Sequence, residues 1–283
     1  MPVIGITLGD AAGIGPEIVA AALSSGKLDA RFEYRVIGET AGPRPGEPTP
    51  ATARAACAAL EESARLLRGG EIAAVVTGPI HKARMQAEGF AFPGQTEFFA
   101  ARAGVKNFAM CLTGGALTVA LVTAHVPLRD VAALLSAREI IRVGQLLAAF
   151  LTTRLGRAPR IAVAGLNPHA GESGTLGREE LTVIAPALAH LPSPVFTGPL
   201  SPDTVFCRAV AGEFDGVLCM YHDQGLIPLK LHAFDSGVNV TLGLPYPRTS
   251  PDHGTAFELA GKNLARPDSM IAALKLAAEL ARP

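Results

Sequence analysis

Tryptophan is absent from this 283-residue chain, and aromatic residues make up only 5% of it. Surfaces that bind nucleic acid rely on basic stripes and on aromatic rings that stack with bases. Lysine and arginine together number 25, as do aspartate and glutamate, so the formal net charge is zero. The composition therefore argues against nucleic acid or an anionic membrane as the main partner.

The chain also lacks cysteine pairs and long apolar runs. Its four cysteines form no Cys-x-x-Cys pair, and Cys111 and Cys219 lie in apolar segments, where a free thiol behaves as a small hydrophobe. No uncharged apolar run approaches the length that spans a bilayer. Residues 1–10 lack the basic start of a signal peptide. We expect a cytoplasmic protein in a reducing compartment, without a membrane segment.

Charged residues are scarce as well, at 18%, and the mean hydropathy is +0.31. Alanine-rich helices explain such a balance, and so does a buried interface between subunits, because obligate interfaces resemble a protein core. The length allows one large domain or two small ones.

Strand and helix patterns alternate along the chain, which predicts an α/β fold with a mainly parallel sheet covered on both faces. Ser136 and Glu139 match a capping box at the start of a long helix that Gly156 ends. Apolar runs predict strands at residues 3–8, 33–37, 72–76, 117–122, 161–166, 216–220 and 238–242. Further helices are expected from residue 16 and at residues 51–67, 79–88, 178–191, 203–210, 256–261 and 268–281, with a loop at 41–50.

Three histidines, His125, His169 and His222, each follow one of the apolar runs in a loop rich in polar residues, glycine or proline. Open α/β sheets bind ligands beyond the carboxyl ends of their strands. Three imidazoles delivered there are a candidate metal site, because three protein ligands leave a coordination position open for a substrate. A single histidine at a strand end is more often a hydrogen-bonded core or surface residue.

The polar segments together resemble the 4-hydroxythreonine-4-phosphate dehydrogenase family of pyridoxal phosphate biosynthesis. The resemblance runs in order over nearly the whole chain and rests on five motifs: Gly9-Asp10 with Gly13-Ile14-Gly15-Pro16-Glu17; Thr77-Gly78-Pro79 with His81-Lys82; Asn167-Pro168-His169-Ala170-Gly171-Glu172; His222-Asp223-Gln224-Gly225 with Pro228 and Lys230; and Asp252-His253-Gly254-Thr255-Ala256.

The resemblance implies two three-layer α/β/α domains of the isocitrate/isopropylmalate dehydrogenase type, with the active cleft between them. The first domain would comprise residues 1–90 and 263–283. The second, residues 91–262, would carry the metal contacts, the phosphate contacts and the dimer interface. The same resemblance implies a homodimer whose active site lies at the interface and takes metal ligands from both subunits.

A small phosphorylated substrate is the expected partner. Matched to the family motifs, its contacts would be Gln95, Thr96, Lys230, Asn239 and Arg248. Lysine and arginine bind phosphate through charge and forked hydrogen bonds, although a solvated surface position is the ordinary explanation for any one of them.

Asp223 and Lys230 are the candidate catalytic residues. Asp223 either orients the neighbouring ligand His222, the more common role of such a carboxylate, or takes part in proton transfer. The implied reaction oxidises 4-phosphohydroxy-L-threonine with NAD or NADP, followed by loss of CO₂. Three imidazoles suit Zn²⁺ or Co²⁺ better than Mg²⁺, although the family accepts more than one divalent ion.

One position departs from the family pattern. Gln95 stands where the family has a substrate-contacting histidine, and glutamine can neither carry a positive charge nor shuttle a proton. Ala11, in place of a usual proline, is a milder departure, and the region of residues 41–50 is abbreviated relative to the family pattern.

The glycine-rich segment 9–15 spaces its glycines as G-x-x-x-G-x-G, which differs from the dinucleotide fingerprint G-x-G-x-x-G. Glu39 is only a rough match for the acidic residue of that fingerprint. The segment fits an anion seat or simply a tight turn. His81 and Lys82 begin a predicted helix, and His253 precedes another; His190 and His232 have no supporting context and are expected at the surface.

Alternative functions remain open within and beyond this class. A threonate phosphate or a cis-dihydrodiol carboxylate would be a related substrate, with the retained Thr96, Asn239 and Arg248 favouring a phosphate. A three-histidine site would also serve a metal hydrolase or aldolase, neither of which needs a nicotinamide cofactor. A ligand-binding protein without catalysis fits the combined motifs less well.

Overall fold

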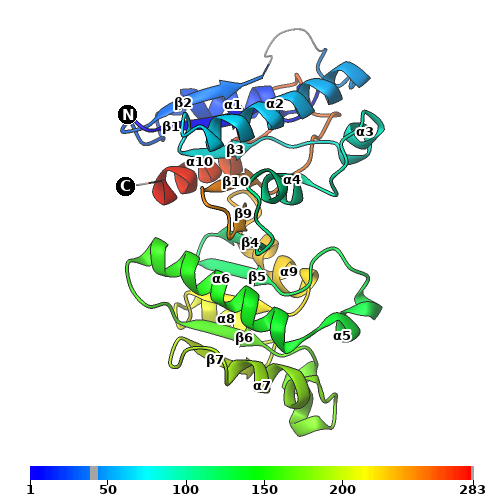
Figure 1. Ribbon diagram of the computed structural model, residues 1–283, viewed down its shortest axis with the longest axis vertical. Coiled ribbons are helices and arrows are strands. Elements are labelled where there is room, and N and C mark those ends of the chain that lie inside the picture. Colours follow the sequence, from blue (N-terminus) through cyan, green and yellow to red (C-terminus); the bar gives the residue numbers. More distant parts are fainter. Residues whose placement is uncertain (39–43, 282–283) are drawn as a thin grey trace. The chain divides into compact units, whose positions relative to one another are not determined.

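The computed structural model describes residues 1–38 and 44–281 (Figure 1). The chain forms two compact units. Unit 1 comprises Met1–Lys106 and Val238–Pro283, and unit 2 comprises Asn107–Gly237. Glu39 and part of the predicted 41–50 loop lie outside the described residues. No helix in the described ranges is long and apolar enough to cross a membrane.

Unit 1 is a mixed sheet covered by helices. Its strands are β1 (Val3–Thr7), β2 (Glu33–Ile37), β3 (Ala74–Thr77), β9 (Val238–Leu242) and β10 (Arg248–Pro251), in the order β2-β1-β3-β10-β9. Its helices are α1 (Gly15–Ser24), α2 (Pro50–Arg68), α3 (Lys82–Ala87), α4 (Gln95–Arg102) and α10 (Asp268–Leu280). All pairs are parallel except β9 with β10.

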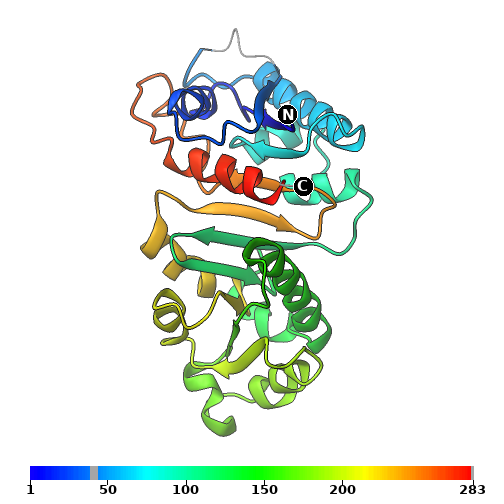
Figure 2. The same ribbon diagram turned by 90° about the vertical axis from the view of Figure 1, so that its left-hand side faces the viewer.

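The two faces of the unit 1 sheet have separate apolar cores. On one face, Val75 of β3 packs in a single cluster with residues of α2, α3 and α4, including Phe98 and Phe99. The neighbouring residue Val76 points to the other face, because side chains alternate along a strand. There α1 and α10 pack against each other, so helices cover both faces (Figure 2).

Unit 2 has the same layered construction. Its strands are β4 (Ala109–Gly114), β5 (Leu117–Leu121), β6 (Ile161–Ala164), β7 (Phe196–Leu200) and β8 (Gly216–Cys219), in the order β4-β5-β8-β6-β7. Its helices are α5 (Val131–Leu134), α6 (Ala137–Leu155), α7 (Ala185–Leu188), α8 (Val205–Val210) and α9 (His222–Ala233). Three further turns are not α-helical: η1 (Leu128–Asp130), η2 (Pro168–Gly174) and η3 (Glu180–Ile184). Helix α6 lies on one face, and α8 and α9 lie on the other (Figure 2).

Several predicted elements are observed with little or no change. Strands β2 and β9 have the predicted bounds. Helix α6 begins after Ser136, whose Oγ accepts a hydrogen bond from the Glu139 N–H at 3.3 Å, and it ends at Gly156 in the left-handed conformation. Both ends were predicted from local signals, and local hydrogen bonding explains why those signals suffice.

Other predictions were wrong or incomplete. Residues 256–261 form successive turns rather than a helix, because Ala256 has a φ of 41° and the N–H groups bond three residues back. The expected helix at 178–191 begins as the wide π-turn η3 before α7, where Pro186 has no N–H to donate. Helices α4, α5 and α9 and strands β4, β7 and β10 were not predicted.

The boundaries between the units also differ from the predicted ones near residues 90 and 262. Helix α4 belongs to unit 1 because Phe98 and Phe99 are buried in its core. Strand β10 pairs in parallel with β3, and β9 pairs with β10, so both strands belong to unit 1 as well. Consequently Asn239 and Arg248 lie in unit 1, whereas the three histidines lie in unit 2.

Candidate active site

The three histidines follow three adjacent strands of the unit 2 sheet. His125 comes after β5, His222 after β8 and His169 after β6, and β8 pairs in parallel with both of the others. The carboxyl ends of adjacent parallel strands meet at one edge of a sheet, where α/β proteins bind ligands. This edge is the one at which the sequence placed a metal site.

His125 and His222 lie together on one cavity. Their ring centroids are 5.4 Å apart and the ring planes are tilted by 41°. The cavity has a volume of about 340 Å³ and is lined by Thr123, His125, Val126, Leu128, Val131, Tyr221, His222, Asp223 and Ile227. Thr123 and Tyr221 were not among the predicted site residues, although each lies close in sequence to a predicted histidine.

Asp223 lies beside His222, as the sequence analysis expected of an orienting carboxylate. Asp223 Oδ1 is 2.7 Å from His222 Nδ1. A proton on Nδ1 that is donated to the carboxylate leaves the Nε2 lone pair of His222 available. A carboxylate-oriented imidazole beside a second imidazole is a donor set that suits a nitrogen-preferring divalent ion.

His169 lies on a strained turn and does not line this cavity. Within η2, residues 169–173 all have φ values between 43° and 80°, and only Gly171 among them is a glycine. A left-handed turn of L-residues costs roughly 1–2 kcal/mol per residue. Over the described ranges, no group of three or more His, Cys, Asp or Glu side chains is close enough to hold a metal ion. The structure therefore brings two of the three predicted ligands together.

Unit 1 contains a buried arginine whose hydrogen-bond acceptors are all neutral. Arg248, the first residue of β10, is 3% exposed. Its guanidinium donates to Thr77 Oγ1 at 2.6 Å, Thr241 Oγ1 at 3.3 Å and Gln95 Oε1 at 3.3 Å, and its Nε has no hydrogen-bond partner. Burial lowers the pKa of the guanidinium to about 10, against an opposing attraction from Glu97. A buried cation of this kind favours an anionic ligand.

Predicted substrate contacts surround this arginine. Gln95 and Thr96 are the first two residues of α4. The first backbone N–H groups of a helix have no partner within it and point past its N-terminus, where they favour an anion. Thr96 Oγ1 lies 3.5 Å from Thr241 Oγ1 on β9. Asn239 is two residues from Thr241 on the same face of β9, and its Oδ1 is buried without a hydrogen-bond partner. Thr77 and Thr241 were missed, although Thr77 belongs to a recognised motif.

Lys230, the fifth predicted contact, lies in the last turn of α9 in unit 2. It is therefore on the helix that begins with His222 and Asp223. Lys230 and Arg248 therefore belong to different units, whereas the predicted boundary near residue 262 put both in one domain.

The glycine-rich segment 9–15 is a tight turn, one of the two interpretations left open above. Gly9 has a φ of 74°, and a Cβ there would lie 2.0 Å from the Pro79 carbonyl oxygen. A Cβ on Gly15 would lie 1.9 Å from the Leu8 carbonyl oxygen. Both positions require glycine because the backbone of another segment passes so closely.

Two of the other histidines have local contacts. His81 caps α3 by accepting from the Arg84 N–H, and its ring stacks on Phe257 at 5.9 Å. His232 is exposed, as expected, and accepts from the Ala116 N–H at 3.1 Å. His190 is also exposed.

Comparison with known proteins shows which family the chain is similar to. Residues 17–277 match the family model described as pyridoxal phosphate biosynthetic protein PdxA. A 4-hydroxythreonine-4-phosphate dehydrogenase from Desulfosudis oleivorans is 43% identical over 325 aligned positions, which cover 99% of this chain and 96% of that protein.

Solved structures show the same relationship. A 4-hydroxythreonine-4-phosphate dehydrogenase from Klebsiella pneumoniae, 35% identical, superposes over the whole of both chains with a TM-score of 0.86. The isocitrate dehydrogenase from Methylococcus capsulatus is only 17% identical, with 96% of this chain and 84% of that one covered and a TM-score of 0.52. The second likeness concerns the fold alone and agrees with the expected dehydrogenase-type architecture.

Proposed function

This chain belongs to the family of the pyridoxal phosphate biosynthetic protein PdxA, and on that premise we propose that it is a 4-hydroxythreonine-4-phosphate dehydrogenase. The reaction removes a hydride from the carbon that bears the secondary hydroxyl of 4-phosphohydroxy-L-threonine and passes it to NAD or NADP, while the hydroxyl proton is released. The product, 2-amino-3-oxo-4-phosphooxybutanoate, then loses CO₂ to give 3-amino-2-oxopropyl phosphate.

The observation that carries the proposal is the buried Arg248 with neutral hydrogen-bond partners. A phosphate group supplies the missing negative charge, and an arginine fork binds it through charge-assisted hydrogen bonds. Gln95 and Thr96, at the start of α4, and Asn239, with its unpaired Oδ1, supply neutral groups for the same anion. We assign Lys230 as a fifth contact and as a candidate for proton transfer.

His125, His169 and His222 are the proposed metal ligands, with Asp223 orienting His222 through Nδ1. A divalent ion held there supplies Lewis acidity, which favours the deprotonated form of the substrate hydroxyl. Imidazole ligation favours Zn²⁺ or Co²⁺ over Mg²⁺. His125 and His222 line one cavity, and His169, from the same chain or from a second copy, is the proposed third ligand.

A homodimer is part of the proposal, and α9 supplies its support. This helix is apolar on two sides. Leu226 and Leu229 pack into the unit 2 core. Ile227 and Leu231 are 66% and 88% exposed, and Phe234, directly after the helix, is 75% exposed. Exposed apolar stripes of this kind mark protein interaction surfaces. Because His222 begins the same helix, an interface along α9 reaches the histidine cavity.

The decisive experiment follows the appearance of the reduced cofactor by its absorbance. The purified protein is supplied with NAD or NADP and with Zn²⁺, Co²⁺ or Mg²⁺ in turn. We expect turnover of 4-phosphohydroxy-L-threonine that depends on the metal. The absence of turnover with every cofactor and metal, under conditions in which a known dehydrogenase of this family is active, would contradict the proposal.

A threonate phosphate is the second candidate substrate, and Gln95 is the observation that favours it. A neutral amide at this position departs from the histidine of the family pattern while leaving Arg248 in place. In the same assay, a higher kcat/KM on the threonate phosphate than on 4-phosphohydroxy-L-threonine would select this candidate. A dihydrodiol carboxylate lacks the phosphate and is expected to be a poor substrate.

A further inference from the structure

A chain of buried hydrogen bonds joins the three strand ends that carry the histidines. Thr123 Oγ1, two residues before His125, donates to the Met220 carbonyl at 2.7 Å. The Met220 N–H donates to Gln224 Oε1 at 2.7 Å, and Gln224 Nε2 donates to the Gly165 carbonyl at 2.7 Å. These bonds connect the end of β5 to that of β8, and the end of β8 to that of β6.

The central member of this chain has to be an amide. Gln224 is buried and uses its oxygen as an acceptor toward β8 and its nitrogen as a donor toward β6. A glutamate has no N–H for the Gly165 carbonyl, and an apolar side chain would leave both backbone groups without a partner. Gln224 lies in the first turn of α9, two residues after His222, so one helical turn both presents His222 and fixes β6.

A buried carboxylate holds the same strand end from its other side. Glu180 is 2% exposed, and its Oε1 accepts from the Leu166 and Asn167 N–H groups, both at 2.7 Å. Its Oε2 accepts from Asn167 Nδ2 at 3.0 Å. Hydrogen bonds to a charged acceptor are stronger than neutral ones. Glu180 thus fixes the two residues that lead from β6 into the His169 turn.

The turn itself needs such support. His169, Ala170, Glu172 and Ser173 have left-handed backbone angles that L-residues seldom adopt, and such conformations persist only where the surroundings enforce them. Gly171 packs directly on Glu180, since a Cβ at this glycine would lie 2.6 Å from Glu180 Oε2. The position of the His169 imidazole therefore depends on groups outside the turn.

We propose that Gln224 and Glu180 are positioning residues that fix the His169 turn relative to the ends of β5 and β8 in the same chain, whichever subunit supplies each of the three ligands. The affinity for the metal ion, and not only the stability of the fold, then depends on both side chains. The inference rests on the proposed function, because it takes the three histidines as the metal ligands.

The test measures metal binding directly in Gln224→Glu and Glu180→Gln, which keep the size of each side chain. Zn²⁺ affinity is measured by competition with a chromophoric chelator, and the geometry of the site by the visible spectrum of bound Co²⁺. Loss of a group that orients metal ligands typically lowers metal affinity 10- to 100-fold. We expect a decrease in this range and a changed Co²⁺ spectrum in both variants.

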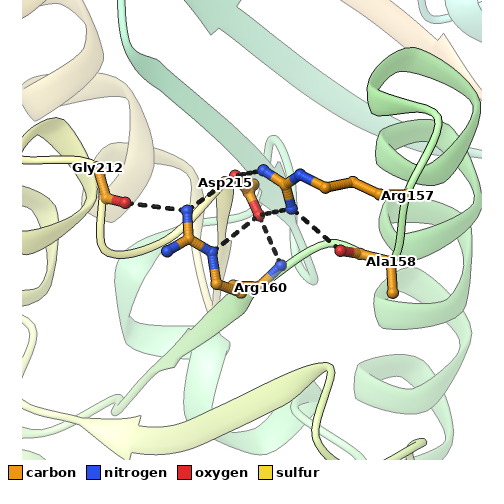
Figure 3. Close-up of polar contacts among 5 residues, drawn as sticks. All are labelled: Arg157, Ala158, Arg160, Gly212 and Asp215. Atoms are coloured by element: carbon orange, nitrogen blue, oxygen red, sulfur yellow. Dashed lines mark hydrogen bonds and ion pairs between the residues drawn. The ribbon is translucent and has the colours of Figure 1, made fainter.

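Asp215→Asn is the matched control, because Asp215 ties together the opposite, amino ends of β6 and β8. Its carboxylate accepts from the side chains of Arg157 and Arg160 and from the Arg160 N–H at 2.8 Å (Figure 3). We expect Asp215→Asn to lower the thermal unfolding temperature while leaving Zn²⁺ affinity and the Co²⁺ spectrum as in the wild type. An equal loss of affinity in this control would reduce Gln224 and Glu180 to a general structural role and overturn the proposal.

Two further variants keep the result interpretable. Thr123→Val removes the hydroxyl donor but leaves the Thr123 N–H bonded to the Met220 carbonyl at 3.2 Å, so we expect a smaller, severalfold loss of Zn²⁺ affinity. This variant still tests the proposal if Gln224→Glu does not fold.

His222→Ala tests the ligand assignment itself. If His222→Ala loses the metal while Gln224→Glu and Glu180→Gln retain it, the inference alone is wrong. If His222→Ala binds metal like the wild type, the ligand assignment and the inference are both wrong.

Discussion

Gln95 Oε1 accepts a hydrogen bond from Arg248 Nη2 at 3.3 Å, and the same amide donates from Nε2 to the Gly78 carbonyl at 3.1 Å. Both ends of the Gln95 side chain are therefore engaged before any substrate binds. The amide partly satisfies the buried guanidinium without adding charge.

Gln95→His is predicted to improve kcat/KM on 4-phosphohydroxy-L-threonine below about pH 7, where histidine can be protonated. A hydrogen bond to a charged group contributes about 1.5–3 kcal/mol, which corresponds to a gain on the order of ten- to a hundredfold. The gain should fade as the pH rises through the histidine pKa. Steady-state kinetics from pH 6 to 9, a range chosen around the ordinary histidine pKa of about 6.5, measure it.

The same variant should use a threonate phosphate less well if Gln95 reflects a different natural substrate. If wild type and Gln95→His had the same kcat/KM on each of the two substrates, position 95 would not contact the substrate.

Arg248→Met is predicted to abolish stabilisation of the protein by phosphate. A ligand that binds only the folded state stabilises it by about 2.7 kcal/mol at a hundredfold excess over Kd. Wild type should therefore show a Tm that rises with inorganic phosphate, and Arg248→Met a Tm that does not. Differential scanning calorimetry over a phosphate series gives the comparison.

Arg31→Met is the control for this experiment, since Arg31 is an exposed arginine of unit 1 that pairs with Asp29. It should keep the full phosphate response. A similar response in Arg248→Met would place the phosphate elsewhere.

Mixed dimers of His222→Ala and His169→Ala are predicted to regain about half of the wild-type activity per mixed dimer if each site takes these two ligands from different chains. One of the two sites then keeps all of its histidines, whereas the other loses two. If both ligands came from one chain, neither site would be complete and no activity would return. Co-expression with two affinity tags isolates the mixed species for assay.

Leu231→Glu, added to both of these chains, is the control for the dimer interface. Leu231 is 88% exposed on α9, and a buried unpaired carboxylate there would disfavour association. The mixed dimer should then fail to form, as light scattering would report, and the restored activity should disappear. Leu264→Glu, at an exposed leucine of unit 1, should leave association unchanged.

Asp215→Asn is predicted to lower the free energy of unfolding by about 1–2 kcal/mol. This is less than the roughly 1.5–3 kcal/mol of a hydrogen bond to a charged group, because both arginine partners are half exposed and solvent weakens their attraction to the carboxylate. Hydrogen bonds from Arg157, and then from Arg160, hold the pKa of the Asp215 carboxyl well below its usual range, against the opposing effect of burial. A carboxyl with a depressed folded-state pKa stabilises the protein above its unfolded pKa, near 3.9, and loses this contribution as the pH falls further.

The difference in stability between wild type and Asp215→Asn should accordingly be constant from pH 7 to about pH 5 and shrink below that. Urea denaturation at several pH values measures it. A difference that shrank already between pH 7 and pH 5 would assign the effect to another group.

Local signals predicted many elements and most of the positions proposed for the site. Ser136 and Gly156 placed both ends of α6, because a cap is a hydrogen bond within a few residues. The motifs around His125 and His222 identified two side chains that the structure brings to one cavity. Strand periodicity was sufficient for β2 and β9, where a single stretch of backbone decides the conformation.

Elements whose conformation depends on distant contacts were missed or misplaced. Helix α9 contains Gly225 and Pro228, which locally favour a loop, and it forms because Leu226 and Leu229 are buried in the unit 2 core. The unit boundary was misplaced because β10 belongs to unit 1 only through its pairing with β3. Such pairings leave no local pattern in the sequence.

The sequence by itself determined the family, the layered α/β architecture and the candidate ligands, because hydrophobic periodicity, caps and motifs are properties of neighbouring residues. Only the tertiary structure decided how these residues are held. The left-handed turn of His169 contains non-glycine residues that would not adopt it alone, and the buried Glu180 supports it from η3. The neutral surroundings of Arg248 come from Thr77 and Gln95, which are distant from it in sequence, and from Thr241 on the neighbouring strand β9. The two distant partners reach the guanidinium only in the folded chain.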